Sequence, residues 1–202
     1  MQQVTEWTPR TRLGSLVASG KIAGLEEIFE NRLAIKEPEI VKTLVPDMKS
    51  NVVSVSIVQK QTDAGEMTRF NALVAVGNEN GWFGIGHGKA PQVRNAIEKS
   101  TNSAFLNVIP IRLGCGSWEC RCSEQHSVPY RTIGKGGSVR VEIIPGPRGL
   151  GLVAGENVKG LLTLAGVKDA WTKTFGSTTT ASSVVTAVYD ALKKVHGLNV
   201  VK

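Results

Sequence analysis

The sequence lacks any apolar run close to the roughly 18 residues that a membrane-spanning helix requires. Its first residues, Met1 to Trp7, lack the basic stretch and apolar core of a secretory signal. Cysteine is scarce: Cys115, Cys120 and Cys122 are an odd number crowded into one short segment, which argues against a secreted disulfide framework. These absences predict a cytoplasmic protein that is not associated with a membrane.

Catalytic constellations are also missing. His87 and His196 are far apart in the sequence, and no Ser–His–Asp or paired-carboxylate arrangement can be argued from spacing. The chain has no internal repeat and no low-complexity tract. We therefore expect a folded protein that is not an enzyme.

What the chain has in excess is positive charge. Its 202 residues include 24 Lys and Arg against 17 acidic residues, for a net charge of +7 and a pI near 9.5. This balance favours a polyanionic partner, because each neutralised phosphate releases condensed counterions. Charge alone does not separate RNA, DNA and an acidic membrane, so the motifs have to distinguish them.

The N-terminal extension, residues 1–47, is expected to be an arm with short helices. Leu25 and Ile28 have helical spacing, as do apolar residues after Pro38. The leading end carries both positive charge and an aromatic residue, Trp7. Such an arm either lies along another surface in an assembly or packs as an extension of its own protein, and the sequence leaves both open.

The first compact unit is expected to hold three antiparallel strands and a helix. Val53, Val55 and Ile57 alternate with serines, as in a strand with one buried face. Asn80 and Gly81 both tolerate positive φ and suit the turn of a hairpin. With the preceding helix, the order helix, three strands, helix is that of a double-stranded-RNA-binding domain. The predicted elements are strands near residues 53–57, 70–76 and 82–86, a turn over 78–81, and a helix with Pro91 at its first position.

The second compact unit is expected to be βαβα-like. Val139, Val141 and Ile143 share one face of a strand, and Gly166 fits the left-handed position that ends a helix. The predicted elements are strands near Val128–Ile133, Ser138–Ile144 and Val167–Lys173, a helix over Glu156–Ala165, and a long helix from Ala181 closed by Gly197.

A resemblance to a known family rests on two sets of motifs in these units. The motifs are Arg69–Ala90 in the first unit and Gly137–Val141, Pro145–Gly151, Ala165–Asp169 and Lys173–Ser177 in the second. In order and spacing they resemble the two domains of the small-subunit ribosomal protein five family, from Val52 to Val195. The extension with Trp7 and the loop Lys60–Gly65 resemble the archaeal and eukaryotic branch, and the cysteines with His126 favour an archaeal-type member.

The resemblance implies an α+β fold of two domains. The first is a double-stranded-RNA-binding-like domain, with a three-stranded antiparallel sheet and helices, and the second has a left-handed βαβ crossover. The implied boundaries are 1–47 for the extension, 48–113 for the first domain, 114–127 for a linking Cys/His segment, and 128–202 for the C-terminal βαβα domain.

The resemblance also implies a function. Members are structural constituents of the small ribosomal subunit that bind its rRNA and contribute to subunit assembly and decoding accuracy. The implied neighbours are ribosomal proteins four and eight, with the mRNA entrance nearby. Bacterial members usually have a basic residue after the glycine of the first hairpin loop, where this chain has Glu66 and Met67, so detailed loop contacts are not carried over. The alternative is a free-standing RNA-binding regulatory protein.

Two glycine motifs invite nucleotide-binding interpretations that their context excludes. Gly84–Lys89 lacks the spacing of a P-loop. Its remaining interpretations are close approach of backbone N–H groups and Lys89 to RNA phosphate, or a tight turn. Gly149–Ala154 with Asp169 formally matches a dinucleotide fingerprint, but prolines interrupt the preceding strand. A rigid loop that presents Arg148 to a phosphate fits that stretch better.

The sharpest local signal is the set Cys115, Cys120, Cys122 and His126. Three thiolates and one imidazole match a closed, tetrahedral, structural zinc site. The single residue between Cys120 and Cys122 is shorter than the usual spacing. Three reduced cysteines in a tight loop, or a Cys115–Cys120 disulfide, are the alternatives. A catalytic zinc is not expected, because no nearby glutamate has a clear general-base placement.

Basic residues gather around the predicted loops and helix starts, and we expect about half of them to touch phosphate. The candidate RNA-binding residues are Lys60, Arg69, Lys89, Arg94, Arg112, Arg131, Lys135 and Arg148.

Overall fold

A computed structural model describes residues 7–120, 122 and 124–197 of the chain. It divides into two compact units, Met1–Met48 and Lys49–Lys202. The leading residues 1–6 and the end of the predicted C-terminal domain, 198–202, lie outside the described residues. Among the helices that are described, none is long and apolar enough to cross a membrane.

The N-terminal unit consists of short helices connected by irregular chain. The helices expected around Leu25 and after Pro38 are confirmed, whereas α1 has no counterpart among the expected elements. Thr11 caps α1 with its hydroxyl, and the indole N–H of Trp7 donates to a Glu37 carboxylate oxygen at 3.0 Å. The helices are α1 (Arg12–Ala18), α2 (Leu25–Glu30) and α3 (Pro38–Leu44).

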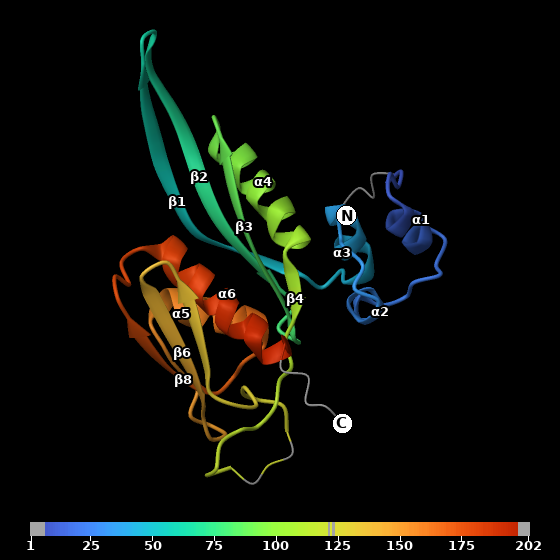
Figure 1. The fold of residues 1–202 in the computed structure, drawn as a ribbon, viewed down its shortest axis with the longest axis vertical. Helices are drawn as coiled ribbons and strands as arrows, with labels where there is room; N and C mark the ends of the chain where they lie inside the picture. Colours follow the sequence, from blue (N-terminus) through green and yellow to red (C-terminus); the bar gives the residue numbers. More distant parts are fainter. Residues whose placement is uncertain (1–6, 121, 123, 198–202) are drawn as a thin grey trace. The chain divides into compact units, whose positions relative to one another are not determined.

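The first sheet of the second unit is antiparallel, with strand order β1-β2-β3-β4 (Figure 1). Its first two strands form a long hairpin, and β3 pairs only with the inner part of β2, from Phe70 to Gly77. The three expected strands are confirmed, and a short fourth strand follows α4. The elements are β1 (Lys49–Thr62), β2 (Gly65–Gly77), β3 (Trp82–Ala90), α4 (Val93–Leu106) and β4 (Val108–Pro110).

The expected alternation of Val53, Val55 and Ile57 on one buried face of β1 is wrong. A register shift between Val52 and Ser54 interrupts the pairing with β2. The inward–outward alternation of side chains before the shift therefore does not continue after it. Val53 packs against the main core, whereas Val55 and Ile57 are 42% and 65% exposed. The outer half of the hairpin therefore extends beyond the core with apolar side chains in solvent.

The turn between β2 and β3 spans residues 78–81, as expected, but one of its two positive φ angles falls on an unexpected residue. Positive φ occurs at Glu79 (58°) and Gly81 (98°), not at Asn80. The Asn78 side chain accepts hydrogen bonds from the N–H groups of Asn80 and Trp82, at 2.9 and 3.0 Å. This side chain closes the turn locally, as asparagine does in Asx turns.

Helix α4 starts slightly later than expected. Gln92 is its N-cap and Val93 its first residue, so Pro91 precedes the helix instead of occupying its first position. A proline is tolerated there because no helical hydrogen bond requires its missing N–H.

Gly84–Lys89 is part of strand β3, so the tight-turn interpretation is wrong and the motif does not form a loop at a helix start. Gly84, Gly86 and Gly88 lie directly under the backbone of α4. A Cβ atom at Gly86 would lie 2.1 Å from the carbonyl oxygen of Ser100. The glycines therefore permit close helix–sheet packing, which is a structural use of the motif.

The second sheet is mixed, with strand order β5-β6-β8-β7. Strands β7 and β8 are parallel and are connected through α5, which forms a βαβ unit. Gly166 ends α5 with φ 90°, as predicted. Strands β5 and β8 start after Val128 and Val167, apolar residues that are buried outside the strands. The elements are β5 (Thr132–Gly136), β6 (Val139–Pro145), β7 (Leu152–Val153), α5 (Glu156–Ala165), β8 (Ala170–Phe175) and α6 (Ala181–Gly197).

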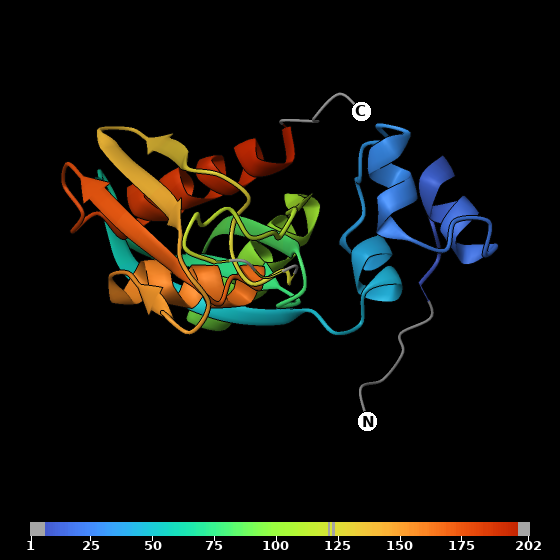
Figure 2. The ribbon, with the colours of Figure 1, turned by 90° about the horizontal axis from the view of Figure 1, so that it is seen from below.

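The two sheets share one buried cluster, to which α5 and α6 also contribute. Phe83 of β3, Val141 of β6 and Leu162 of α5 are members with no exposed surface. Phe83 also lies near Tyr189 of α6, with ring centroids 6.4 Å apart. Helix α6 packs against β5 and β6 of the second sheet (Figure 2). The predicted α+β fold class is confirmed.

Candidate metal centre and nucleic-acid surface

The Cys/His segment is an irregular loop between β4 and β5 whose ends are held together. Gly114 and Ser127 exchange two backbone hydrogen bonds of 2.8 Å. Gly116 lies against the following chain, because a Cβ atom there would be 2.1 Å from the carbonyl oxygen of Pro129. These backbone contacts fold the loop on itself and turn its cysteines toward one another.

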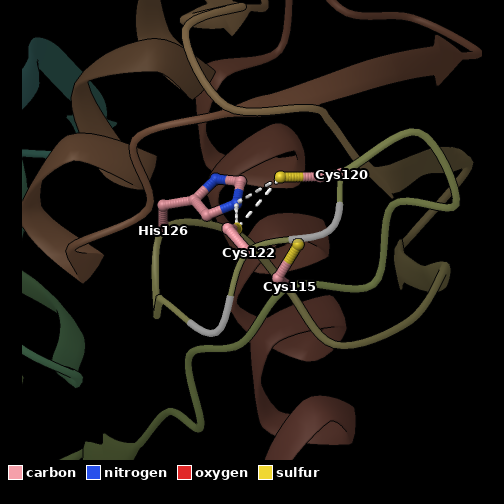
Figure 3. Close-up of side chains that lie close together, drawn as sticks. All are labelled: Cys115, Cys120, Cys122 and His126. Carbon is pink, nitrogen blue, oxygen red and sulfur yellow. Dashed lines mark hydrogen bonds between the residues drawn. The ribbon is translucent and has the colours of Figure 1, made fainter.

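The structure brings together the four residues that the sequence singles out. The ligand atoms of Cys115, Cys120, Cys122 and His126 all lie within 4.8 Å of one another (Figure 3). The Cys120 and Cys122 sulfurs are 3.0 Å apart, and His126 Nε2 lies 3.2 Å from Cys122 Sγ. Three sulfurs and one imidazole nitrogen are the donor set of a structural zinc site, and four protein ligands leave no open position for a substrate.

A buried carboxylate orients the histidine. His126 Nδ1 lies 2.9 Å from Asp169 Oδ2, and both side chains are almost fully buried. The other Asp169 oxygen accepts the Gly151 N–H at 2.7 Å. An acceptor at Nδ1 leaves Nε2, which faces the thiols, free to bind a metal. The sequence gives no signal for this role of Asp169, because 43 positions separate it from His126. Spacing relates Asp169 only to the formal dinucleotide fingerprint.

The thiols differ in acidity. The neighbouring Cys122 thiol, together with the backbone N–H of Arg148, lowers the pKa of Cys120 to about 6. The same partnership, with Cys120 as the first cause, raises the pKa of Cys122 to about 11. One thiolate is therefore present near neutral pH, which is the form that a metal ion binds.

The Arg148 loop is tied to the Cys/His segment in two ways. Its backbone N–H bonds to Cys120, and its guanidinium forms an ion pair with Glu124 at 3.1 Å. Both charged side chains are about three-fifths exposed, so this ion pair contributes little to stability.

Three candidate basic residues lie on one face of the first sheet. Lys60 pairs with Met67, Arg69 lies two residues further along the same strand, and Lys89 pairs with Asn71. Residues two apart share a face, so Lys60, Arg69 and Lys89 point to the same side. All three are exposed, and they lie at the end of the sheet from which the hairpin extends.

The remaining candidates are distributed over other elements. Arg94 lies in the first turn of α4 and pairs with Glu98 at 3.1 Å. Arg112 is exposed just after β4, and Lys135 is exposed on β5. Arg131 forms an ion pair with the buried Glu142. The candidate residues therefore come from several elements of the fold.

Comparison with known proteins identifies the family. Family models described as ribosomal protein S5, N-terminal domain, and ribosomal protein S5, C-terminal domain, match residues 48–112 and 134–201. A protein named small ribosomal subunit protein uS5 from Thermofilum pendens is 52% identical, over 95% of each chain. The protein of the same name from Cenarchaeum symbiosum is 57% identical, over 93% of this chain and 86% of the relative. The chain thus belongs to the ribosomal protein S5 family, in its archaeal branch, and is a structural protein and not an enzyme.

Proposed function

We propose that the chain is a structural constituent of the small ribosomal subunit that binds the subunit's rRNA. The observation that carries this proposal is the match of both family models together with relatives, named as small-subunit proteins, that align over nearly the whole chain. The net charge of +7 and the exposed basic residues support an RNA partner.

The basic residues bind phosphates where rRNA helices converge and so fix the relative positions of those helices. Lys60, Arg69 and Lys89 share one face of the first sheet, and Arg94 begins the adjoining helix. Arg112, Arg131, Lys135 and Arg148 contribute from other elements. Contacts of this kind give affinity through charge and shape more than through base sequence.

In the subunit, the chain contributes to assembly and to decoding accuracy near the mRNA entrance. Ribosomal protein four is its neighbour there, and ribosomal protein eight is a second neighbour. The hairpin of β1 and β2 supports a role at a distance from the protein body, because its outer half projects beyond the core. Glu66 and Met67 lie at that outer end, where Glu66 adds a negative charge and Met67 supplies no positive charge for RNA.

The Cys/His segment binds a structural zinc ion through Cys115, Cys120, Cys122 and His126. Its convergent donor atoms and the buried His126–Asp169 contact support this assignment. Bound zinc supplies cross-links among the loop residues. These residues then hold the Arg148 loop close to the segment through the Cys120 and Glu124 contacts.

Sedimentation of a cell extract through washes of rising salt tests the ribosomal role. We expect the chain to remain stoichiometric with small subunits after a high-salt wash. A peripheral protein would be released, because log affinity falls with log salt by about 0.9 per phosphate contacted on duplexes. Elution as a free protein, or with other RNAs, would instead support a free-standing RNA-binding regulator.

Elemental analysis and thermal unfolding test the zinc site. We expect one zinc per purified chain. Cys120→Ser should lower the melting temperature by about 5–10 °C while RNA binding persists, because the metal stabilises only the folded state. Chelation should lower the melting temperature of the unmodified chain but not that of the variant. Absence of zinc together with an unchanged melting temperature would refute the metal site.

A further inference from the structure

The second sheet has an outer face that no described element covers. Val139, Val141 and Ile143 of β6 are fully buried in the core with α5 and α6. Side chains alternate along a strand, so Arg140 and Glu142 point to the opposite, outer face. The strand register adds the cross-strand partners of these residues. The outer-face residues are Ile133 and Lys135 of β5, Arg140, Glu142 and Ile144 of β6, and Trp171, Lys173 and Phe175 of β8.

This outer face exposes large apolar side chains. Ile133, Trp171 and Phe175 are 49%, 45% and 54% exposed. Trp171 and Phe175 lie on the same strand with Lys173 midway between them, so a cation separates the two aromatic rings. Two exposed aromatic rings on one strand have no role in the core and are suited to stacking with planar ligands.

The charge of the outer face is positive. Among the outer-face residues, Lys135, Arg140 and Lys173 are cations and Glu142 is the single acid, which gives a net charge of +2. Glu142 is buried, and Arg131 forms an ion pair with it, so it offers little repulsion to an anion.

The positions of two cations point to an anionic ligand. Lys135 and Arg140 are direct cross-strand partners in the β5–β6 ladder, and like charges in such pairs are destabilising. Within the described residues neither side chain forms an ion pair that could offset this repulsion. Arg140 is in turn the direct partner of Phe175, so one row of the sheet presents two cations and an aromatic ring.

We propose that this outer face binds single-stranded RNA, with bases stacked on Trp171 and Phe175 and phosphates held by Lys135, Arg140 and Lys173. The inference rests on the proposed function, which makes rRNA the partner, and adds a second kind of contact to it. Stacking on an open sheet is how several RNA-binding modules hold unpaired bases. A protein partner fits less well, because lysine is depleted from protein interfaces and two cations would lie unpaired against it.

Direct binding of the full chain to RNA tests the proposal. The probes are an oligouridylate of about 12 nucleotides, within the usual footprint of such sites, and a duplex RNA of the same length. Trp171→Leu and Phe175→Leu keep apolar bulk but remove the π-face. We expect each to weaken binding of the single strand by about five- to a hundredfold and to leave duplex binding nearly unchanged. Phe175→Tyr should retain the affinity.

Lysine variants test the phosphate contacts. Lys173→Gln should lower the slope of log affinity against log salt by about 0.7 on the single strand. Lys159→Gln, an exposed lysine of α5 outside this face, is the matched control and should leave the slope unchanged. Equal slopes for the two variants would remove Lys173 from the site.

Ultraviolet crosslinking in intact small subunits decides between RNA and protein as the ligand. We expect an RNA crosslink on the peptide that contains Trp171 or Phe175. A crosslink from this peptide to another protein, or unchanged single-strand affinity of both leucine variants, overturns the proposal. If the stacking proposal fails but the unmodified chain still co-sediments with small subunits, the proposed ribosomal role stands. If the unmodified chain does not co-sediment, the ribosomal role is refuted.

Discussion

The two sheets of the larger unit are covered by helices in the same way. In the first sheet α4 lies on Gly84, Gly86 and Gly88, and in the second α6 lies on Gly134 and Gly136. In each sheet the helix lies so close to the strand backbone that no side chain fits between them. Such close contact packs helix backbone directly against strand backbone. A single added methyl group in either interface should therefore lower the stability of the fold.

The sheets differ on their opposite faces. The first sheet directs Leu73, Phe83 and Ile85 into the shared core, so its second face is largely required for folding. The second sheet directs Trp171 and Phe175 into solvent. Residues on a face that contributes little to folding can serve binding without a loss of stability. The exposed face of the second sheet therefore suits the proposed RNA-stacking surface better than either face of the first sheet.

The largest expected effect tests the shared helix–glycine packing. Gly86→Ala and Gly134→Ala should each destabilise the protein by about 3 kcal/mol, because the new Cβ atoms would overlap the Ser100 and Ala187 carbonyl oxygens. Urea unfolding measures both. Gly160→Ala, in the middle of α5 and with room for a methyl group, is the control and should stabilise by about 0.5–1 kcal/mol. Equal behaviour of all three variants would contradict the packing argument.

The second expected effect concerns a connection that only the second sheet has. Asp169, just before β8, holds Nδ1 of His126. In Asp169→Asn the amide oxygen is needed by the Gly151 N–H, so the NH2 group faces His126 Nδ1. This arrangement favours the tautomer that carries its proton on Nε2, which cannot bind a metal. We expect zinc affinity to fall by about 10- to 100-fold in competition with a chromogenic chelator. Unchanged affinity would show that the carboxylate does not orient the ligand.

A smaller effect is expected where α6 meets β5. The Asp190 carboxylate accepts hydrogen bonds from the Lys135 N–H at 3.0 Å and Lys194 Nζ at 2.8 Å. Partial burial acts to raise the pKa of Asp190, but the Lys194 hydrogen bond and charge prevail and lower it. The stabilisation is therefore present above the unfolded-state pKa and is lost as pH falls through the lowered folded-state value.

Asp190→Asn should accordingly cost about 0.5–1 kcal/mol at neutral pH, a modest value because the group is partly exposed. The difference between the variant and the unmodified chain should vanish in acid, as followed by thermal unfolding across pH. A difference that stayed constant with pH would assign the loss to packing instead of charge.

The smallest expected effect is that of a methyl deletion in the projecting hairpin, compared with the same deletion in the second sheet's core. Ile57→Val and Ile143→Val remove the same methyl group, but Ile57 is 65% exposed and Ile143 is fully buried. The first change should stay within about 0.5 kcal/mol and the second should cost about 0.5–1.5 kcal/mol. Equal costs would mean that the outer hairpin is packed more firmly than its exposure indicates.

Local patterns in the sequence determined the helices of the C-terminal part and the metal-ligand set. Helix α5 occupies the predicted range Glu156–Ala165, and α6 begins at the predicted Ala181, because helical periodicity and a C-terminal glycine act within a few residues. Cys115, Cys120, Cys122 and His126 could be grouped for the same reason, since a short loop keeps them close whatever the rest of the fold does.

Tertiary structure alone decided the features that depend on distant segments. The glycines of β3 acquire their role from α4, the bulge of β1 from pairing with β2, and Asp169 from a histidine 43 positions away. The same holds for the outer face of the second sheet, where strand register sets Arg140 beside Lys135 and Phe175. Local sequence spacing cannot specify these contacts, because their energies arise between surfaces that meet only after the chain has folded.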